Sequence, residues 1–207
     1  MTSDTARKRR SSAEVLSLIR DAAYEEFACT GLAGASIRSI AERAGVTESM
    51  VFRHFSSKAE LFQVAAAGPV VRYMYEFASS IASNPDEGPT DVTERFVSGL
   101  YDLCMANRRI LISLAADASE DVGLDAEPAF DACLDALVRG INRYSAANNS
   151  SARGNLKDTV RLTLAVVLGA TMSGNDLFPR STDRSSITAM LAQFVLYGAG
   201  YRTPDIT

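Results

Sequence analysis

One short stretch, RSIAERAGVTESMVFRHFSSK at residues 38–58, gathers side chains that are well suited to bind an anion. It holds His54, the single histidine of this 207-residue chain, together with Arg38, Arg53 and Lys58. Guanidinium groups donate paired hydrogen bonds to guanine or phosphate, and imidazole, ammonium and hydroxyl groups donate to phosphate oxygens. These residue types therefore indicate recognition of a nucleic-acid backbone and of base edges rather than catalysis.

Other chemistries find less support in the sequence. The one histidine does not belong to a Ser-His-Asp, paired-carboxylate or phosphate-loop pattern, so no enzyme activity is expected. The three cysteines, at positions 29, 104 and 133, are spaced too widely for a zinc site or a disulfide framework, and we expect no metal or cofactor. Three alternatives stay open: a helical enzyme, a ligand-free architectural DNA-binding protein, and a redox-sensing regulator in which Cys104 and Cys133 pair under oxidation.

Composition and charge are consistent with a DNA-binding segment on a larger acidic body. Hydrophobic residues make up 47% of the chain, enough for a sizeable core. The net charge is −4, yet residues 1–60 hold nine Lys and Arg against eight Asp and Glu. No apolar run reaches the roughly 18–20 residues of a membrane helix, and no secretory signal is evident. We expect a cytoplasmic protein without a membrane partner.

The elements that position these side chains are predicted to be helices. Apolar residues recur at helical spacing almost throughout, and no alternating strand pattern competes with them. Ser11, Ser36, Thr47 and Ser57 are the expected N-caps, and Gly31 the expected end of the first helix. The fold class is therefore all-α with about nine helices, expected at about residues 11–30, 37–44, 48–54, 57–83, 92–107, 108–119, 128–144, 156–177 and 184–200.

The two short helices joined at Gly45 are typical of a helix-turn-helix. Ala41 permits a close helix crossing, and Gly45 permits the backbone angle of the turn. The N-terminal part of the second short helix is the part that such a motif presents to the major groove. The residues expected to contact base edges are Arg38, Thr47, Glu48, Ser49, Met50 and Arg53. Those expected to contact phosphate are Ser36, His54, Ser57 and Lys58.

The segment SIRSIAERAGVTESMVFRHFSSKAELF, residues 36–62, resembles the N-terminal signature of TetR-type transcriptional regulators. The resemblance rests on the Ile-Ala pair, Ala-Gly-Val, the aromatic-x-His-Phe pattern and the following lysine, and it covers about residues 12–65. It implies a DNA-binding regulator, usually a repressor of a double-stranded DNA operator. Two positions depart from the family pattern: Phe52 stands where tyrosine is usual, and Met50 where threonine is frequent.

The resemblance also implies the organisation of the remaining chain. Residues 1–10 would be a basic arm, 11–56 the helix-turn-helix domain, and 57–207 a helical ligand-binding and dimerisation domain. A homodimer would form through the last two helices, at about 156–177 and 184–200, and the apolar character of 156–177 favours this pairing. A small apolar or aromatic effector would enter a pocket among the middle helices, for which we predict Tyr73, Phe77, Phe96, Tyr101, Met105, Phe130, Leu137, Asn142 and Asn175.

Overall fold

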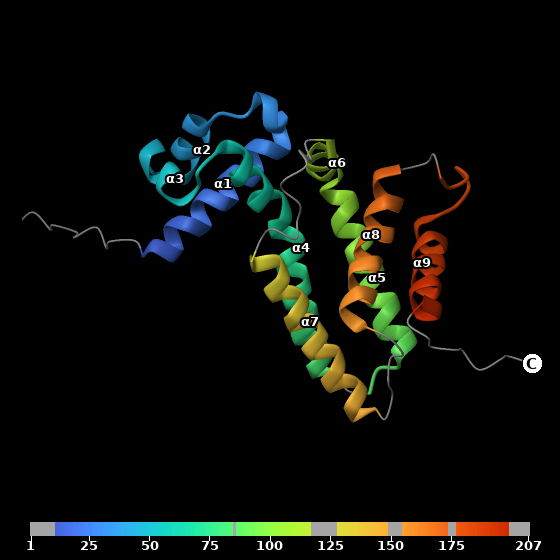
Figure 1. Ribbon diagram of the computed structural model, residues 1–207. Helices are drawn as coiled ribbons and strands as arrows, with labels where there is room; N and C mark the ends of the chain where they lie inside the picture. Colours follow the sequence, from blue (N-terminus) through green and yellow to red (C-terminus); the bar gives the residue numbers. More distant parts are fainter. Residues whose placement is uncertain (1–10, 85, 117–127, 149–154, 174–176, 199–207) are drawn as a thin grey trace, which may run out of the picture. The chain divides into compact units, whose positions relative to one another are not determined.

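The computed structural model describes residues 11–84, 86–116, 128–148, 155–173 and 177–198. These described ranges contain nine α-helices and no β-strand, so the predicted all-α class is confirmed (Figure 1). The basic arm at residues 1–10 lies outside them. The helices are Ser12–Gly34 (α1), Ile37–Ala44 (α2), Glu48–His54 (α3), Lys58–Ser83 (α4), Pro89–Ala106 (α5), Arg108–Ala116 (α6), Pro128–Ala147 (α7), Leu156–Ser173 (α8) and Arg184–Gly198 (α9).

The chain divides into two compact units between Ala66 and Ala67, within α4. The first unit, called the head below, contains α1–α3 and the beginning of α4. The second unit, called the body, contains the rest of α4 and α5–α9. The sequence places its boundary at residues 56–57, where α4 begins. The first turns of α4 pack in the head because Leu61 and Phe62 are completely buried there.

Short-range capping signals start the helices of the head. The amide of Glu14 donates to Oγ of Ser11 (3.2 Å), and the amide of Ser11 donates to Oε2 of Glu14 (2.6 Å), which completes the predicted capping box. Ser36 caps α2 and Thr47 caps α3, each by accepting from the amide three residues on. Because these bonds satisfy otherwise unpaired amides, each helix begins where its cap predicts.

Two glycines shape the head through left-handed backbone angles. Gly45, at φ 63°, ends α2 and makes the tight turn into α3, as predicted. Gly31, at φ 68°, was expected to end the first helix, but α1 continues to Gly34 across a kink at this residue. The amide of Ala35 donates to the Gly31 carbonyl (3.2 Å), so the chain resumes a helical turn after the kink.

A compact apolar core and two ion pairs hold the head together. The rings of Phe27 on α1 and Phe62 on α4 meet edge to face with centroids 4.9 Å apart, and both side chains are buried. Arg43 of α2 bonds the carboxylates of Glu25 (3.0 Å) and Glu26 (3.4 Å) on α1. Since Glu26 is almost fully buried, this arginine compensates a charge that would otherwise be costly.

The body is built around α5, which packs against both α8 and α9, while α6 and α7 also contact α8. Figure 1 shows α4 and α7 running side by side, and the Cys133 thiol of α7 lies 3.6 Å from the sulfur of Met74 on α4. Arg108 at the start of α6 donates to the carbonyls of Thr171 (2.9 Å) and Met172 (2.8 Å), which satisfies the C-terminal end of α8. No described helix combines the length and apolar character needed to cross a membrane.

Candidate functional site

The exposed surface of α3 carries most of the residues predicted to contact base edges. Thr47, Glu48, Ser49, Met50 and Arg53 are all exposed, whereas Val51 on the opposite side is completely buried. The cap at Thr47 and the turn at Gly45 therefore orient one face of a short helix outward. A helix of this kind presents its N-terminal side chains to the major groove in helix-turn-helix proteins.

Arg38 joins this surface from α2. Its Nε donates to Oε1 of Glu42 (3.0 Å), and both side chains are largely exposed. The hydrogen bond to Glu42, together with the charges of Glu42 and Glu48, raises the pKa of Arg38, so its guanidinium stays charged. An exposed pair of this kind exchanges easily, and the guanidinium remains available to a guanine edge.

The residues predicted to contact phosphate lie at the beginnings of helices and near the end of α3. Ser36 and Ser57 are exposed, and each hydroxyl accepts from a backbone amide of the helix that follows it. His54, the last residue of α3, is half-buried. Lys58 has a structural bond as well, because its Nζ donates to the carbonyl of Ala35 (3.1 Å).

The capping box expected between Ser57 and Glu60 forms in part. The amide of Glu60 donates to Oγ of Ser57, but the carboxylate of Glu60 bonds Ser56 instead. The carboxylate of Glu60 accepts from both the amide (2.6 Å) and the hydroxyl (2.5 Å) of Ser56. These bonds lower the pKa of Glu60, so it remains ionised.

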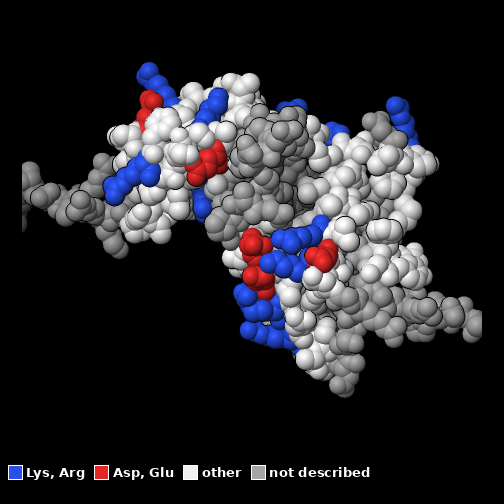
Figure 2. Space-filling model, in the orientation of Figure 1, with Lys and Arg blue, Asp and Glu red and all other residues white. Residues whose placement is uncertain are grey.

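Figure 2 shows basic and acidic side chains interspersed on the visible face rather than one continuous basic patch.

The body contains an apolar pocket lined by residues of five helices. The space free of atoms measures about 630 Å³, and this figure includes a part that is open to solvent. It is lined by Phe77 from α4, Pro89, Val92, Thr93 and Phe96 from α5, Ile141 and Tyr144 from α7, Leu156, Thr159, Val160 and Thr163 from α8, and Val195 from α9.

Two of the nine residues predicted for an effector pocket, Phe77 and Phe96, line this cavity. Tyr73 lies behind them, with its ring stacked on Phe96 at 5.8 Å. Met105 and Asn142 point toward solvent, and Asn175 lies outside the described residues. Three others are buried but do not line this pocket: Tyr101, Phe130 and Leu137. The apolar stripes predicted burial, but the wall formed by α8 was not anticipated.

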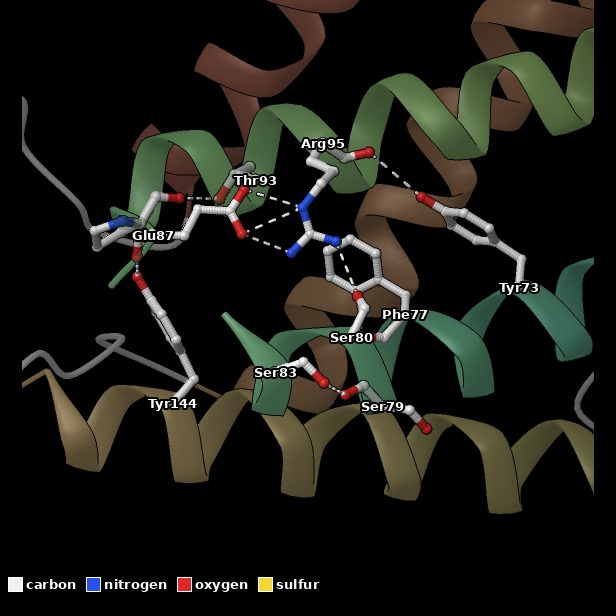
Figure 3. A network of polar contacts seen from close by, with 10 residues as sticks. Tyr73, Phe77, Ser79, Ser80, Ser83, Glu87, Thr93, Arg95 and Tyr144 are labelled. Carbon is white, nitrogen blue, oxygen red and sulfur yellow. Dashed lines mark hydrogen bonds and ion pairs between the residues drawn. The ribbon is translucent and has the colours of Figure 1, made fainter. Parts of the chain in front are cut away.

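A polar network adjoins the pocket (Figure 3). Arg95 of α5 bonds Glu87 through Nε (3.0 and 3.2 Å) and Nη2 (2.7 Å), and its Nη1 donates to Oγ of Ser80 on α4 (2.9 Å). Its guanidinium also lies 4.6 Å from the ring centroid of Phe77. The hydroxyl of Tyr144 donates to the Glu87 carbonyl. The network thus ties α4, α5 and α7 together beside the pocket wall.

The two cysteines considered for a redox switch face different neighbours. Cys133 donates to the Phe130 carbonyl (3.0 Å) and contacts Met74, whereas Cys104 bonds Thr171 on α8. Burial raises the pKa of the Cys104 thiol to about 12, which suppresses the reactive thiolate. All three cysteines, including exposed Cys29, are unpaired by disulfides. The surroundings of Cys104 and Cys133 are those of inert core residues.

An exposed apolar face runs along α8 and α9. Leu162 on α8 is 66% exposed, and Phe194 and Tyr197 on α9 are 63% and 55% exposed. Met190 lies one turn before Phe194 and is also exposed, at 47%. Side chains three or four residues apart share one side of a helix, so α9 presents a continuous apolar stripe. Such a face is typical of an association surface.

Comparisons with known proteins agree with this architecture. Residues 19–65 match the tetR family of bacterial regulatory proteins. No curated protein matches the chain. Among solved structures, a TetR-family transcriptional regulator of Mesorhizobium loti has a TM-score of 0.61 at 16% identity, covering 92% of this chain and 98% of that one. A transcriptional regulator of Rhodococcus sp. Rha1 has a TM-score of 0.57 at 22% identity, covering 94% and 100%.

A third similar structure contains a ligand. The transcriptional regulator FadR of Bacillus subtilis, in complex with stearoyl-CoA, has a TM-score of 0.57 at 13% identity. The alignment covers 88% of this chain and 98% of that one. At these identities the likeness establishes the fold. The proteins matched are transcriptional regulators and not enzymes.

Proposed function

We propose that this chain is a member of the TetR family of bacterial regulatory proteins, and that it is a homodimeric repressor of a palindromic operator that a small apolar ligand releases from DNA. The match of residues 19–65 to that family supports a DNA-binding transcriptional regulator. The observation that carries the proposal is the outward face of the helix-turn-helix at α3, which caps and Gly45 fix in place. The exposed residues on it are Thr47, Glu48, Ser49, Met50 and Arg53. We place the protein in the cytoplasm, where its operator would be.

In the head, one set of residues contacts base edges and another set contacts phosphates. Base edges are contacted by Arg38, Thr47, Glu48, Ser49, Met50 and Arg53. Arginine suits a guanine edge, and the carboxylate of Glu48 suits the amino group of cytosine. Phosphates are contacted by Ser36, His54, Ser57 and Lys58. Support for Ser36, Ser57 and Lys58 comes from their positions at helix starts, where amides and basic side chains favour anions, and His54 adds an imidazole at the end of α3.

Dimerisation uses the exposed apolar face of α8 and α9. Two copies that pair through Leu162, Phe194 and their neighbours would bury side chains that are costly to leave in water. A two-fold dimer places two heads on two half-sites, which is why the operator is expected to be palindromic.

The effector binds in the apolar pocket of the body. Its wall of aliphatic and aromatic side chains favours a hydrocarbon ligand. The stearoyl-CoA complex of the structurally similar FadR supports an effector that carries a long apolar chain. Binding releases DNA if the filled pocket favours a different arrangement of the two heads than the empty one.

Selection of binding sites from a random duplex library with the purified full chain tests this function. The expected product is a palindrome. Arg38→Ala should relax the preference at one position of each half-site, at a cost of about 1–3 kcal/mol against the preferred base. Lys58→Ala should weaken all sequences alike and lower the salt slope by about one.

Arg139→Ala, which removes an exposed arginine of the body, is the matched control for the loss of one positive charge. It should leave both the preferred sequence and the salt slope unchanged. Failure to enrich any sequence at modest salt would refute the proposed operator recognition. Enrichment of a single site without a repeated half would refute the proposal that a dimer binds two half-sites.

A further inference from the structure

We propose that Arg95 binds the anionic head of the effector, and that Glu87 is an internal carboxylate which occupies this position until the effector displaces it. The effector is then an amphipathic anion, with a hydrocarbon tail in the pocket and a carboxylate or phosphate head on Arg95. This inference rests on the proposed function, since it specifies the ligand of the same pocket.

The side chains of the pocket wall offer no hydrogen-bond donor that is not already in use. Each of the four hydroxyl groups donates to a backbone carbonyl. Three lie on threonines and bond the carbonyl four residues earlier in the chain, and the fourth, on Tyr144, bonds the carbonyl of Glu87: Thr93 to Pro89, Thr159 to Asn155, Thr163 to Thr159, and Tyr144 to Glu87. A charged or strongly polar group within the pocket would lose its hydration without replacement. The polar end of a ligand must therefore lie at the edge.

Arg95 is the cation at that edge. It lies on α5 among residues that line the pocket, with Val92, Thr93 and Phe96 close by in sequence. Its guanidinium stacks over Phe77, itself part of the pocket wall (Figure 3). A tail packed against Phe77 would accordingly bring a head group to the guanidinium.

The guanidinium has two contacts besides Glu87. Its Nη1 donates to the Ser80 hydroxyl (2.9 Å), and its plane is supported by the Phe77 ring 4.6 Å away. Nε and Nη2 remain as a parallel pair of donors, which Glu87 now fills with both carboxylate oxygens. Carboxylates and phosphates both match this two-pronged geometry, so either head group fits.

Glu87 is placed so that it can leave. It lies in the connection between α4 and α5 rather than within a helix, and its side chain is 20% exposed. Replacing one carboxylate with another preserves the local charge balance, so an anionic head group can take the place of Glu87 without leaving Arg95 unpaired. The paired Arg95 lowers the pKa of Glu87, so the internal carboxylate is ionised and competes with an anionic ligand.

Displacement of Glu87 would also affect a contact with α7. The backbone carbonyl of Glu87 accepts from the Tyr144 hydroxyl, and the Tyr144 ring lines the pocket. A ligand that occupies both Arg95 and the pocket therefore acts on this contact from two sides. Binding of the head group at Arg95 would therefore change how α7 packs against the loop between α4 and α5.

Calorimetric titration of the full chain tests the proposal with three probes of equal chain length: dodecanoate, dodecyl phosphate and dodecanol, each kept below its micelle concentration. Dodecanoate, dodecyl phosphate or both should bind about 10- to 100-fold more tightly than dodecanol, as expected for charge-assisted hydrogen bonds. The preferred anion identifies the head group. Arg95→Met should abolish the difference between anion and alcohol while leaving the binding of dodecanol unchanged.

Glu87→Gln should strengthen binding of the anion about 3- to 5-fold without affecting dodecanol, because it removes the competing carboxylate. Arg143→Met, at an exposed arginine of α7, is the matched control and should change neither affinity. If Arg95→Met folds poorly because it leaves Glu87 unpaired, the double variant Glu87→Gln/Arg95→Met, which has no unpaired charge, must show the same loss of discrimination.

Two results would overturn the proposal in distinguishable ways. If all three probes bind the wild-type chain equally well, the pocket holds ligands but Arg95 does not select anions, and the proposed function stands. If none of the probes binds, the pocket is not an effector site for hydrocarbon ligands, and both the inference and the effector part of the proposed function fail.

Discussion

The head and the body use helices in opposite ways. In the head, helices with satisfied caps pack around a small core at Phe27 and Phe62, and the polar side chains of interest face outward from α3. In the body, five helices line an apolar pocket, and α8 and α9 expose a second apolar face. The head therefore offers its chemistry at the surface, while the body offers an interior and an association surface. Variants can test whether the two units are as independent as this difference implies.

Truncation of the head core should have the largest effect. Phe27→Ala removes a ring that is 1% exposed and packed on Phe62, and should destabilise the head by about 3–5 kcal/mol. Hydrogen exchange measured helix by helix should show faster exchange in α1–α3 and little change in α5, α8 and α9. Phe130→Ala, the equivalent truncation in the body, should give the reverse pattern. Equal acceleration everywhere in both variants would show one cooperative unit.

Cysteine labelling should separate the two units by reactivity. Burial raises the pKa of Cys104 to about 12, so at pH 8 only about one in 10⁴ of these thiols is ionised, and the fraction increases only as the pH rises toward 12. Exposed Cys29 of the head should be alkylated by iodoacetamide about 1000-fold faster, as followed by peptide mass spectrometry. Comparable rates, or a Cys104–Cys133 disulfide after mild peroxide, would instead support the redox alternative.

A charge on the exposed apolar face should separate dimerisation from folding. Phe194→Glu should give a monomer by sedimentation and weaken operator binding about 100-fold, or about 2.8 kcal/mol, because each head then binds its half-site alone. The helical content should remain, since Phe194 is 63% exposed in the chain by itself. Ala146→Glu places the same charge on exposed α7 and should alter neither property. If the Phe194→Glu variant remains a dimer, the interface must lie elsewhere.

The smallest effect is expected from restoring a hydroxyl on the head. Phe52 is 53% exposed, and Phe52→Tyr adds a donor where the family usually has one. One added hydrogen bond to phosphate should tighten binding about 3- to 10-fold for operator and non-operator DNA alike, without a change in thermal stability. Phe52→Leu should give no such gain. Tighter binding to the operator alone would mean that this side chain contacts a base.

The head could be predicted in detail because its signals are local. The caps at Ser11, Ser36 and Thr47 and the turn at Gly45 each involve residues at most four apart, and the structure confirms them. Two local details differ from the prediction. The helix expected to end at Gly31 continues across a kink, and Glu60 bonds Ser56 instead of completing the box with Ser57.

The body could be predicted only in outline. Helical spacing identified buried residues such as Leu137 and Phe130, yet a stripe does not reveal which part of a buried face is filled and which borders a space. Thr159, Val160 and Thr163 of α8 form one wall of the pocket, which the helical spacing of these residues does not predict. Met105, on an apolar stripe of α5, is 43% exposed because no described helix covers that side.

The sequence by itself determined that the chain is helical, where most helices begin, and that its N-terminal part is a helix-turn-helix with basic and hydroxyl side chains at its surface. These features follow from periodicity, caps and glycine angles, which act over a few residues. Only the tertiary structure decided that five helices line an apolar pocket, that Arg95 lies against its wall paired with Glu87, and that α8 and α9 expose an apolar face. Each of these depends on contacts between residues far apart in the chain, whose side chains meet only after the helices have packed.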